Sequence, residues 1–125
     1  MRALLAGLAL ALAAGPAAAQ ELIAQYGALL SDRDHLNSNG QRLTSAAAII
    51  RQDRANFHRF GRRDPADEWD PVFANVNNRA RMEALLNAGT SSPGAIQAIV
   101  NGRPYVVVQV WGHAGVIDYI DVTVN

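Results

Sequence analysis

The feature that most constrains the fold is an aspartate in the middle of an apolar helix face. At the helical angle of about 100° per residue, several apolar side chains between residues 46 and 60 fall on one side. They are Ala46, Ile49, Ile50, Phe57 and Phe60. Asp53 falls near the middle of that side, and a buried carboxylate is costly unless it is paired or hydrogen-bonded. Thr44 or Ser45 is expected to cap this helix and Gly61 to end it.

Two polar residues of a second predicted helix are candidate partners for that aspartate. Asn78 and Arg79 lie within residues 72–87 and share one side with Met82, which we expect to face the core. A polar network of Asp53 with Asn78 or Arg79 would fix how the two helices meet. The alternative is a carboxylate of perturbed pKa that acts as a general base. Without a visible nucleophile or metal set, the structural interpretation is favoured.

The C-terminal part of the chain predicts a β-hairpin. Residues 105–111 and 116–124 are rich in β-branched and aromatic side chains, and residues 112–115 form a glycine-rich turn. A two-stranded ribbon is marginal on its own, so it must pack on the helices, with residues 21–30 as a candidate third strand. The predicted fold class is therefore α+β, in which two main helices and shorter ones pack on a C-terminal antiparallel hairpin.

Three pairs that end in proline suggest further helix starts. The Asp-Pro pairs at 64–65 and 70–71 and the Ser-Pro pair at 92–93 each offer a capping side chain followed by a residue that tolerates the first helical position. Trp69 lies between the first two pairs. We expect it to anchor its loop to the core, with a sugar-stacking platform as the alternative.

The N-terminus has the three parts of a secretory signal peptide. Met1-Arg2 precedes an uncharged apolar run over residues 3–14 and a series of small residues, which predicts cleavage after Ala19. The apolar run is shorter than the approximately 20 residues that a spanning helix needs, and an uncleaved anchor is the alternative. We therefore expect residues 20–125 to form one exported domain, periplasmic or extracellular, with no membrane span after signal cleavage. The sequence has no cysteine, which excludes disulfides.

Composition excludes several classes of function. Every positive side chain is an arginine, and without Arg2 ten arginines face eleven acidic residues. A near-neutral balance argues against a nucleic-acid-binding protein, which normally shows a basic excess. His35, His58 and His113 lie in three separate segments and lack the spacing of metal ligands. The sequence thus predicts no metal, no cofactor and no nucleic-acid partner.

The central helix carries the candidate binding residues. Arg51, Arg54 and His58 lie at spacings of three and four and are predicted to share one face, where they could hold a phosphate, sulfate or carboxylate. The alternative is a solvated face paired with the acids of residues 64–70. The favoured hypothesis is a non-enzymatic module that binds a protein or a cell-envelope component. The alternative function is a small hydrolase or lyase that uses Asp53 and His58 as acid and base.

Overall fold

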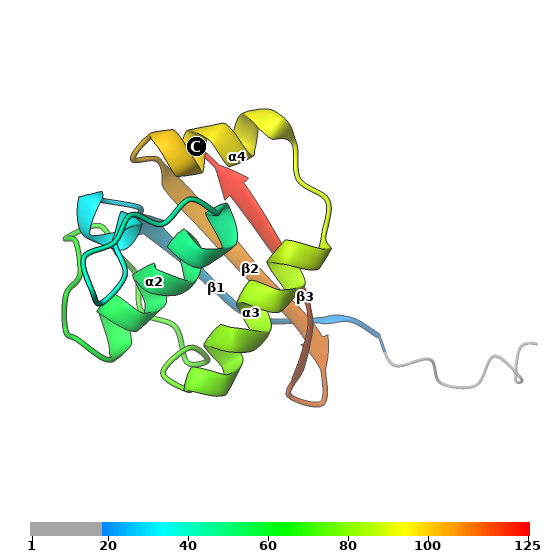
Figure 1. Ribbon diagram of the computed structural model, residues 1–125. Coiled ribbons are helices and arrows are strands. Elements are labelled where there is room, and N and C mark those ends of the chain that lie inside the picture. The colour runs from blue at the N-terminus through cyan, green and yellow to red at the C-terminus, as the bar shows by residue number, and fades with distance from the viewer. Residues whose placement is uncertain (1–18) are drawn as a thin grey trace, which may run out of the picture.

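The computed structural model describes residues 19–125 and shows an α+β fold (Figure 1). In chain order the elements are β1 (Glu21–Leu29), the 3-10 turn η1 (Asp32–His35), α2 (Ala46–His58), α3 (Val76–Ala88), α4 (Pro93–Asn101), β2 (Tyr105–His113) and β3 (Val116–Val124). The predicted fold class is confirmed, and residues 21–30 supply the third strand. The predicted signal peptide falls almost wholly on residues 1–18, outside the described part. Over residues 19–125, no helix combines the length and apolar character needed to cross a membrane.

The three strands form one antiparallel sheet in the order β1-β2-β3. Because side chains alternate across a strand, every second residue of β2 points to the same face. Val106, Val108 and Val110 are fully buried on that face, in one core with Ile49 and Met82. Helices α2 and α3 lie across this side of the sheet (Figure 1). The buried face of the sheet therefore forms the floor of the hydrophobic core.

Helix α2 begins and ends close to its predicted limits. The Ser45 hydroxyl accepts from the Ala48 N–H at 3.1 Å, which confirms one of the two predicted caps. Gly61 has a φ of 65°, which suits the glycine after a helix end. The prediction that Phe60 faces the core is wrong, since its side chain is 39% exposed. The helix ends at His58, so the helical angle no longer applies two residues later.

Of the three helix starts predicted at prolines, one is confirmed. Helix α4 does begin at Pro93, and the Ser92 hydroxyl accepts from the Ala95 N–H at 3.2 Å. The Asp-Pro pairs at 64–65 and 70–71 start only turns and bends, so that part of the prediction is wrong. Helix α3 instead begins after Asn75, whose side-chain oxygen accepts from two backbone N–H groups.

The loop of residues 62–70 covers the C-terminal part of the free edge of β1. Gly27 and Leu29 turn their backbone groups away from β2. The Gly27 N–H donates to Glu68 Oε1 at 2.7 Å, and the Leu29 N–H donates to Asp67 Oδ1 at 2.9 Å. The backbone N–H of Glu68 returns a bond to the Gly27 carbonyl at 2.8 Å. Two carboxylates thus take the place of a fourth strand, which is one way in which proteins protect a sheet edge.

Candidate functional site

Arg54 is fully buried at the junction of α2 and the loop of residues 62–70. Its Nε donates to Asp53 Oδ2 at 2.8 Å, and its Nη1 donates to Asp70 Oδ1 at 2.9 Å. The same Nη1 also donates to the Glu68 carbonyl at 2.9 Å. One guanidinium therefore joins the helix to the loop that closes the β1 edge.

Two aromatic rings enclose the same guanidinium. The Arg54 Cζ lies 3.9 Å from the centre of the Tyr26 ring and 4.5 Å from the centre of the Phe57 ring. The Tyr26 side chain is fully buried, and its hydroxyl lies 3.8 Å from the Met82 sulfur. An arginine between two ring faces gains cation–π stabilisation where water is excluded. Burial raises the pKa of Tyr26 well above its ordinary value, which keeps the hydroxyl neutral.

Asp70 is the acceptor at the centre of this network. Its Oδ1 accepts from Arg54 and lies 2.7 Å from His58 Nε2. Its Oδ2 accepts from the Val72 N–H at 2.7 Å and the Phe73 N–H at 2.6 Å. Burial alone would raise the pKa of Asp70, but the hydrogen bonds from His58, Phe73, Arg54 and Val72 outweigh it and the pKa is lowered. Asp70 is therefore held as a buried anion.

Asp53 is sealed from solvent beside an arginine, as predicted, but its partner is different. The residue is 1% exposed and pairs with Arg54, the next residue in the chain, rather than with Arg79 or Asn78. Burial raises the pKa of Asp53 well above its usual range, and the charge of Arg54 only partly opposes that shift. Its Oδ1 has no hydrogen-bond partner among residues 19–125. Asp53 is thus the weaker of the two counter-charges of Arg54.

Arg79 and Asn78 have a separate structural task. Arg79 Nη1 donates to the Phe73 carbonyl at 2.8 Å, and Asn78 Nδ2 donates to the Val72 carbonyl at 3.0 Å. Both side chains reach back from the start of α3 to the turn before it. They stabilise the entry into the helix and do not contact Asp53.

The structure does not bring Arg51, Arg54 and His58 to one open face. Arg51 pairs with Glu83 of α3 at 2.6 Å, Arg54 lies inside, and the His58 side chain is 8% exposed against Asp70. The physical reason is that the loop of residues 62–70 covers Arg54 and His58, while Glu83 of α3 pairs with Arg51. Their predicted anion-binding role stays a prediction, now without an accessible arginine at position 54.

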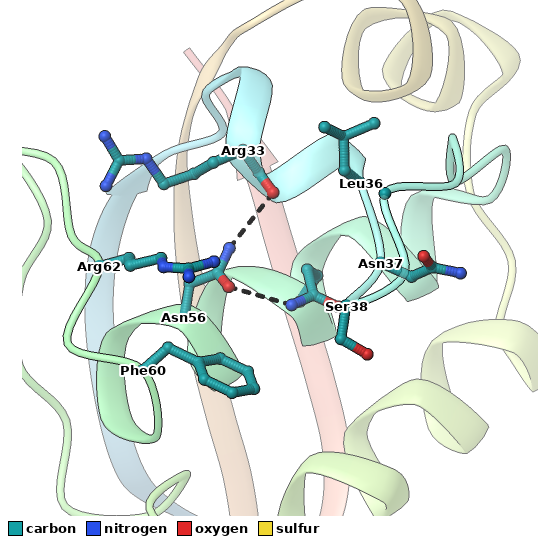
Figure 2. A pocket seen from close by; sticks show the side chains of 9 residues that line it. Arg33, Leu36, Asn37, Ser38, Asn56, Phe60 and Arg62 are labelled. Atoms are coloured by element: carbon teal, nitrogen blue, oxygen red, sulfur yellow. Dashed lines mark hydrogen bonds between the residues drawn. The ribbon is translucent and has the colours of Figure 1, made fainter.

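A small hollow lies on the other side of α2, between the helix and the segment after η1 (Figure 2). Its volume is about 290 Å³. It is lined by Arg33, Leu36, Asn37, Ser38, Gly40, Gln52, Asn56, Phe60 and Arg62. Figure 2 shows the Arg62 side chain directed toward Asn56, with the Phe60 ring beside it, whereas the Arg33 guanidinium points away. Sequence reasoning missed this hollow because its walls come from separate segments.

The side-chain amide of Asn56 lies at the floor of the hollow, and both its nitrogen and its oxygen are hydrogen-bonded. Asn56 Nδ2 donates to Asp34 Oδ1 at 2.8 Å and to the Arg33 carbonyl at 3.3 Å. Asn56 Oδ1 accepts from Gln52 Nε2 at 3.0 Å. Burial raises the pKa of Asp34, although its hydrogen bonds from Asn56 and Ser31 oppose that shift. The hollow therefore has a fixed base and needs no rearrangement to receive a small group.

Four exposed arginines lie on η1, at the end of α2 and in the loop after it, and we call them the arginine surface: Arg33, Arg59, Arg62 and Arg63. Arg33 and Arg62 line the hollow, whereas Arg63 lies over the Phe57 ring, with its Cζ 4.2 Å from the ring centre. Within residues 19–125, none of them has a carboxylate within 4.0 Å. The guanidinium carbons of Arg59 and Arg62 lie 5.1 and 5.7 Å from the centre of the Phe60 ring. The side chains of Asp67, Glu68 and Asp70 are bound at the β1 edge and in the buried network, but Asp32 and Asp64 share another hollow with Arg33, so the basic character is strongest at Arg59 and Arg62.

Trp69 does not anchor its loop, and that expectation is wrong. Its side chain is 67% exposed, while the neighbouring Glu68 and Asp70 hold the loop through polar contacts. In residues 19–125, no group of three or more His, Asp or Glu side chains is placed to hold a metal ion. The expected absence of a metal stays a prediction.

Comparison of the chain with protein-family models, with curated proteins and with solved structures gave no match.

Proposed function

We propose that this chain is an exported, non-enzymatic binding module that holds an anionic group of a protein or cell-envelope partner on the arginine surface. The observation that carries the proposal is the exposed Arg62 at a hollow of about 290 Å³, with Arg59 beside it, since neither arginine has a carboxylate within 4.0 Å in residues 19–125. The guanidinium carbons of Arg59 and Arg62 lie 5.1 and 5.7 Å from the centre of the same Phe60 ring, so an anion bound there would offset the repulsion between two like charges.

The chemistry of the hollow supports one ligand class. The guanidinium fork of Arg62 suits a carboxylate or a phosphate, which it can bind through two parallel hydrogen bonds. Leu36 and Phe60 are 40% and 39% exposed at the same hollow and offer apolar contact. The ligand class is therefore an anionic group attached to a small apolar or aromatic group.

The inaccessibility of Asp53 favours binding over the acid–base alternative. A general base must come within hydrogen-bond reach of the proton that it removes. The Asp53 side chain is 2% exposed and bonded to Arg54, and His58 is bonded to Asp70. Neither residue lines the hollow beside the arginine surface.

The test is an NMR titration of the ¹⁵N-labelled protein with phenyl phosphate, with benzyl alcohol as the uncharged comparison. We expect saturable shifts of the Asn56, Phe60 and Arg62 amides with phenyl phosphate only. Arg62→Gln should weaken binding by about 10- to 100-fold, since one charge-assisted contact is worth about 1.5–3 kcal/mol. Arg42→Gln is the matched control, because Arg42 is exposed on another part of the surface and donates to the Val100 carbonyl. Equal, unsaturable shifts in the parent and in Arg62→Gln would contradict the proposal.

A further inference from the structure

Strand β3 forms the second edge of the sheet, and its outward backbone groups can be identified. The Asn125 N–H donates to the Tyr105 carbonyl at 3.0 Å, so this opposed pair is a hydrogen-bonded one. Bonded pairs alternate along an antiparallel ladder, so Ile120, Val122 and Val124 turn their N–H and C=O groups away from β2. No group in residues 19–125 bonds to these outward backbone atoms. Unlike the Gly27–Leu29 part of β1, this edge is open.

The open edge borders the larger hollow of the molecule. A groove of about 800 Å³ lies among β3, the start of α2, the end of α3 and α4. Its apolar lining includes Leu86, Ile96 and Val122, and Ile96 is 40% exposed. Val122 and Val124 are partly buried on the helix side of the sheet, against the core. A strand added to this edge would thus find both backbone partners and apolar contacts.

We propose that β3 pairs antiparallel with β3 of a second copy of this chain, with the two-fold axis at Val122. In this register Val122 faces Val122 of the second copy, and Ile120 faces its Val124. The residues with outward backbone groups then oppose one another throughout, and each such pair exchanges two N–H···O bonds. The occupant follows from the self-complementarity of the strand, as a two-fold interface requires.

Charge and register together select this pairing. Asp121 then faces Thr123 of the second copy, so no like charges are opposed. Moving the axis to Asp121 places two aspartates directly opposite and leaves Val124 without an outward partner, because the bulge at Asp118 interrupts the pattern there. Moving the axis to Thr123 removes the partner of Ile120. Both neighbouring registers are poorer in hydrogen bonds, and one is opposed by charge.

The side-chain pattern adds burial to the backbone pairing. Side chains of Ile120, Val122 and Val124 from the second copy point to the helix side and extend the apolar surface beside the groove. On the opposite face, Tyr119 is 55% exposed at the same edge and gains cover from the added strand. This inference is independent of the arginine surface, which lies at the far end of α2.

The test is sedimentation velocity of the purified protein over a range of concentrations, with circular dichroism to verify folding. We expect a monomer–dimer equilibrium. Thr123→Asp places like charges opposite Asp121 at two symmetric positions and should weaken the dimer about five-fold, and Thr123→Lys should strengthen it by a similar factor. Both positions lie on the solvent face of the sheet. The exchanged pair Asp121→Lys with Thr123→Asp places opposite charges at the same two positions and should associate about as strongly as Thr123→Lys.

Each remaining outcome would overturn the inference. A monomer at all concentrations excludes the second copy as occupant. A dimer that is insensitive to charges at positions 121 and 123 uses another surface. A monomer whose β3 amides shift on addition of a synthetic peptide of residues 116–124 would assign the edge to a separate extended segment instead of a folded second copy.

Discussion

Replacement of Asp70 by asparagine is the most direct test of the buried network. The carboxylate accepts from Arg54, Val72 and Phe73 and lies against His58, with no exposed surface. Asparagine keeps the size of the side chain but removes the charge and turns one acceptor oxygen into an NH₂ donor. That donor must then face the N–H groups of the backbone or of the arginine.

The expected loss of stability is large because the second counter-charge is weak. Asp53 remains beside Arg54, but burial raises its pKa and disfavours its charged form. Loss of one partner of a buried ion pair costs about 3–5 kcal/mol. A domain of this size loses about 4–8 °C in Tm for each kcal/mol, so we expect Tm to fall by about 12–40 °C.

The assay is thermal and urea unfolding followed by circular dichroism. Asp32→Asn is the matched control, because Asp32 pairs with Arg103 on the surface and both side chains are mostly exposed. It should unfold within error of the parent. An Asp70→Asn protein that melts within about 3 °C of the parent would show that Arg54 does not depend on Asp70 for its charge balance.

Three further predictions concern the same loop and the sheet. Because the pKa of Asp70 is lowered from 3.8 in the fold, its contribution is present above that value and lost as the pH falls below it. The difference in unfolding free energy between the parent and Asp70→Asn should therefore narrow from about pH 4 to pH 2 in urea titrations. Glu68→Ala should speed hydrogen exchange of the Gly27 amide, measured by NMR, and Glu68→Gln should largely preserve protection because it keeps an acceptor oxygen. Gly27→Ala should destabilise the fold by about 1 kcal/mol in urea unfolding, since the added methyl group would overlap the Tyr105 hydroxyl. In a Tyr105→Ala background, the same substitution should cause no measurable loss of stability.

The periodic features of the sequence predicted the fold well. The spacing of apolar residues located α2, and the Ser45 cap and Gly61 gave its limits. The β-branched runs located β2 and β3, and residues 21–30 supplied β1. The unusual position of Asp53 correctly indicated burial beside an arginine. Each of these signals depends on residues that are close together in the sequence, and such residues keep the same local geometry in the folded protein.

The identity of the partners could not be predicted in the same way. Arg54 seemed to belong to an exposed face because nothing in the helix pattern shows that residues 62–70 fold over it. The sequence suggested that Asp70 caps a helix. One of its oxygens does accept from two backbone N–H groups, but no helix starts there, and its other oxygen accepts from Arg54. The arginine surface depends on which acids are used elsewhere. Such information resides only in the tertiary arrangement.

The closure of β1 sets a limit on how many chains one sheet can join. A sheet with two free edges can add a neighbour on each side and grow into a filament. Here Asp67 and Glu68 occupy the Gly27–Leu29 part of the β1 edge, so a further chain cannot pair along that part of the sheet in the proposed β3 dimer. Asp70 holds the same loop in place through Arg54. Detachment of that loop would free the Gly27 and Leu29 backbone groups for a further strand, so the buried Arg54–Asp70 ion pair also bears on how far the sheet can extend.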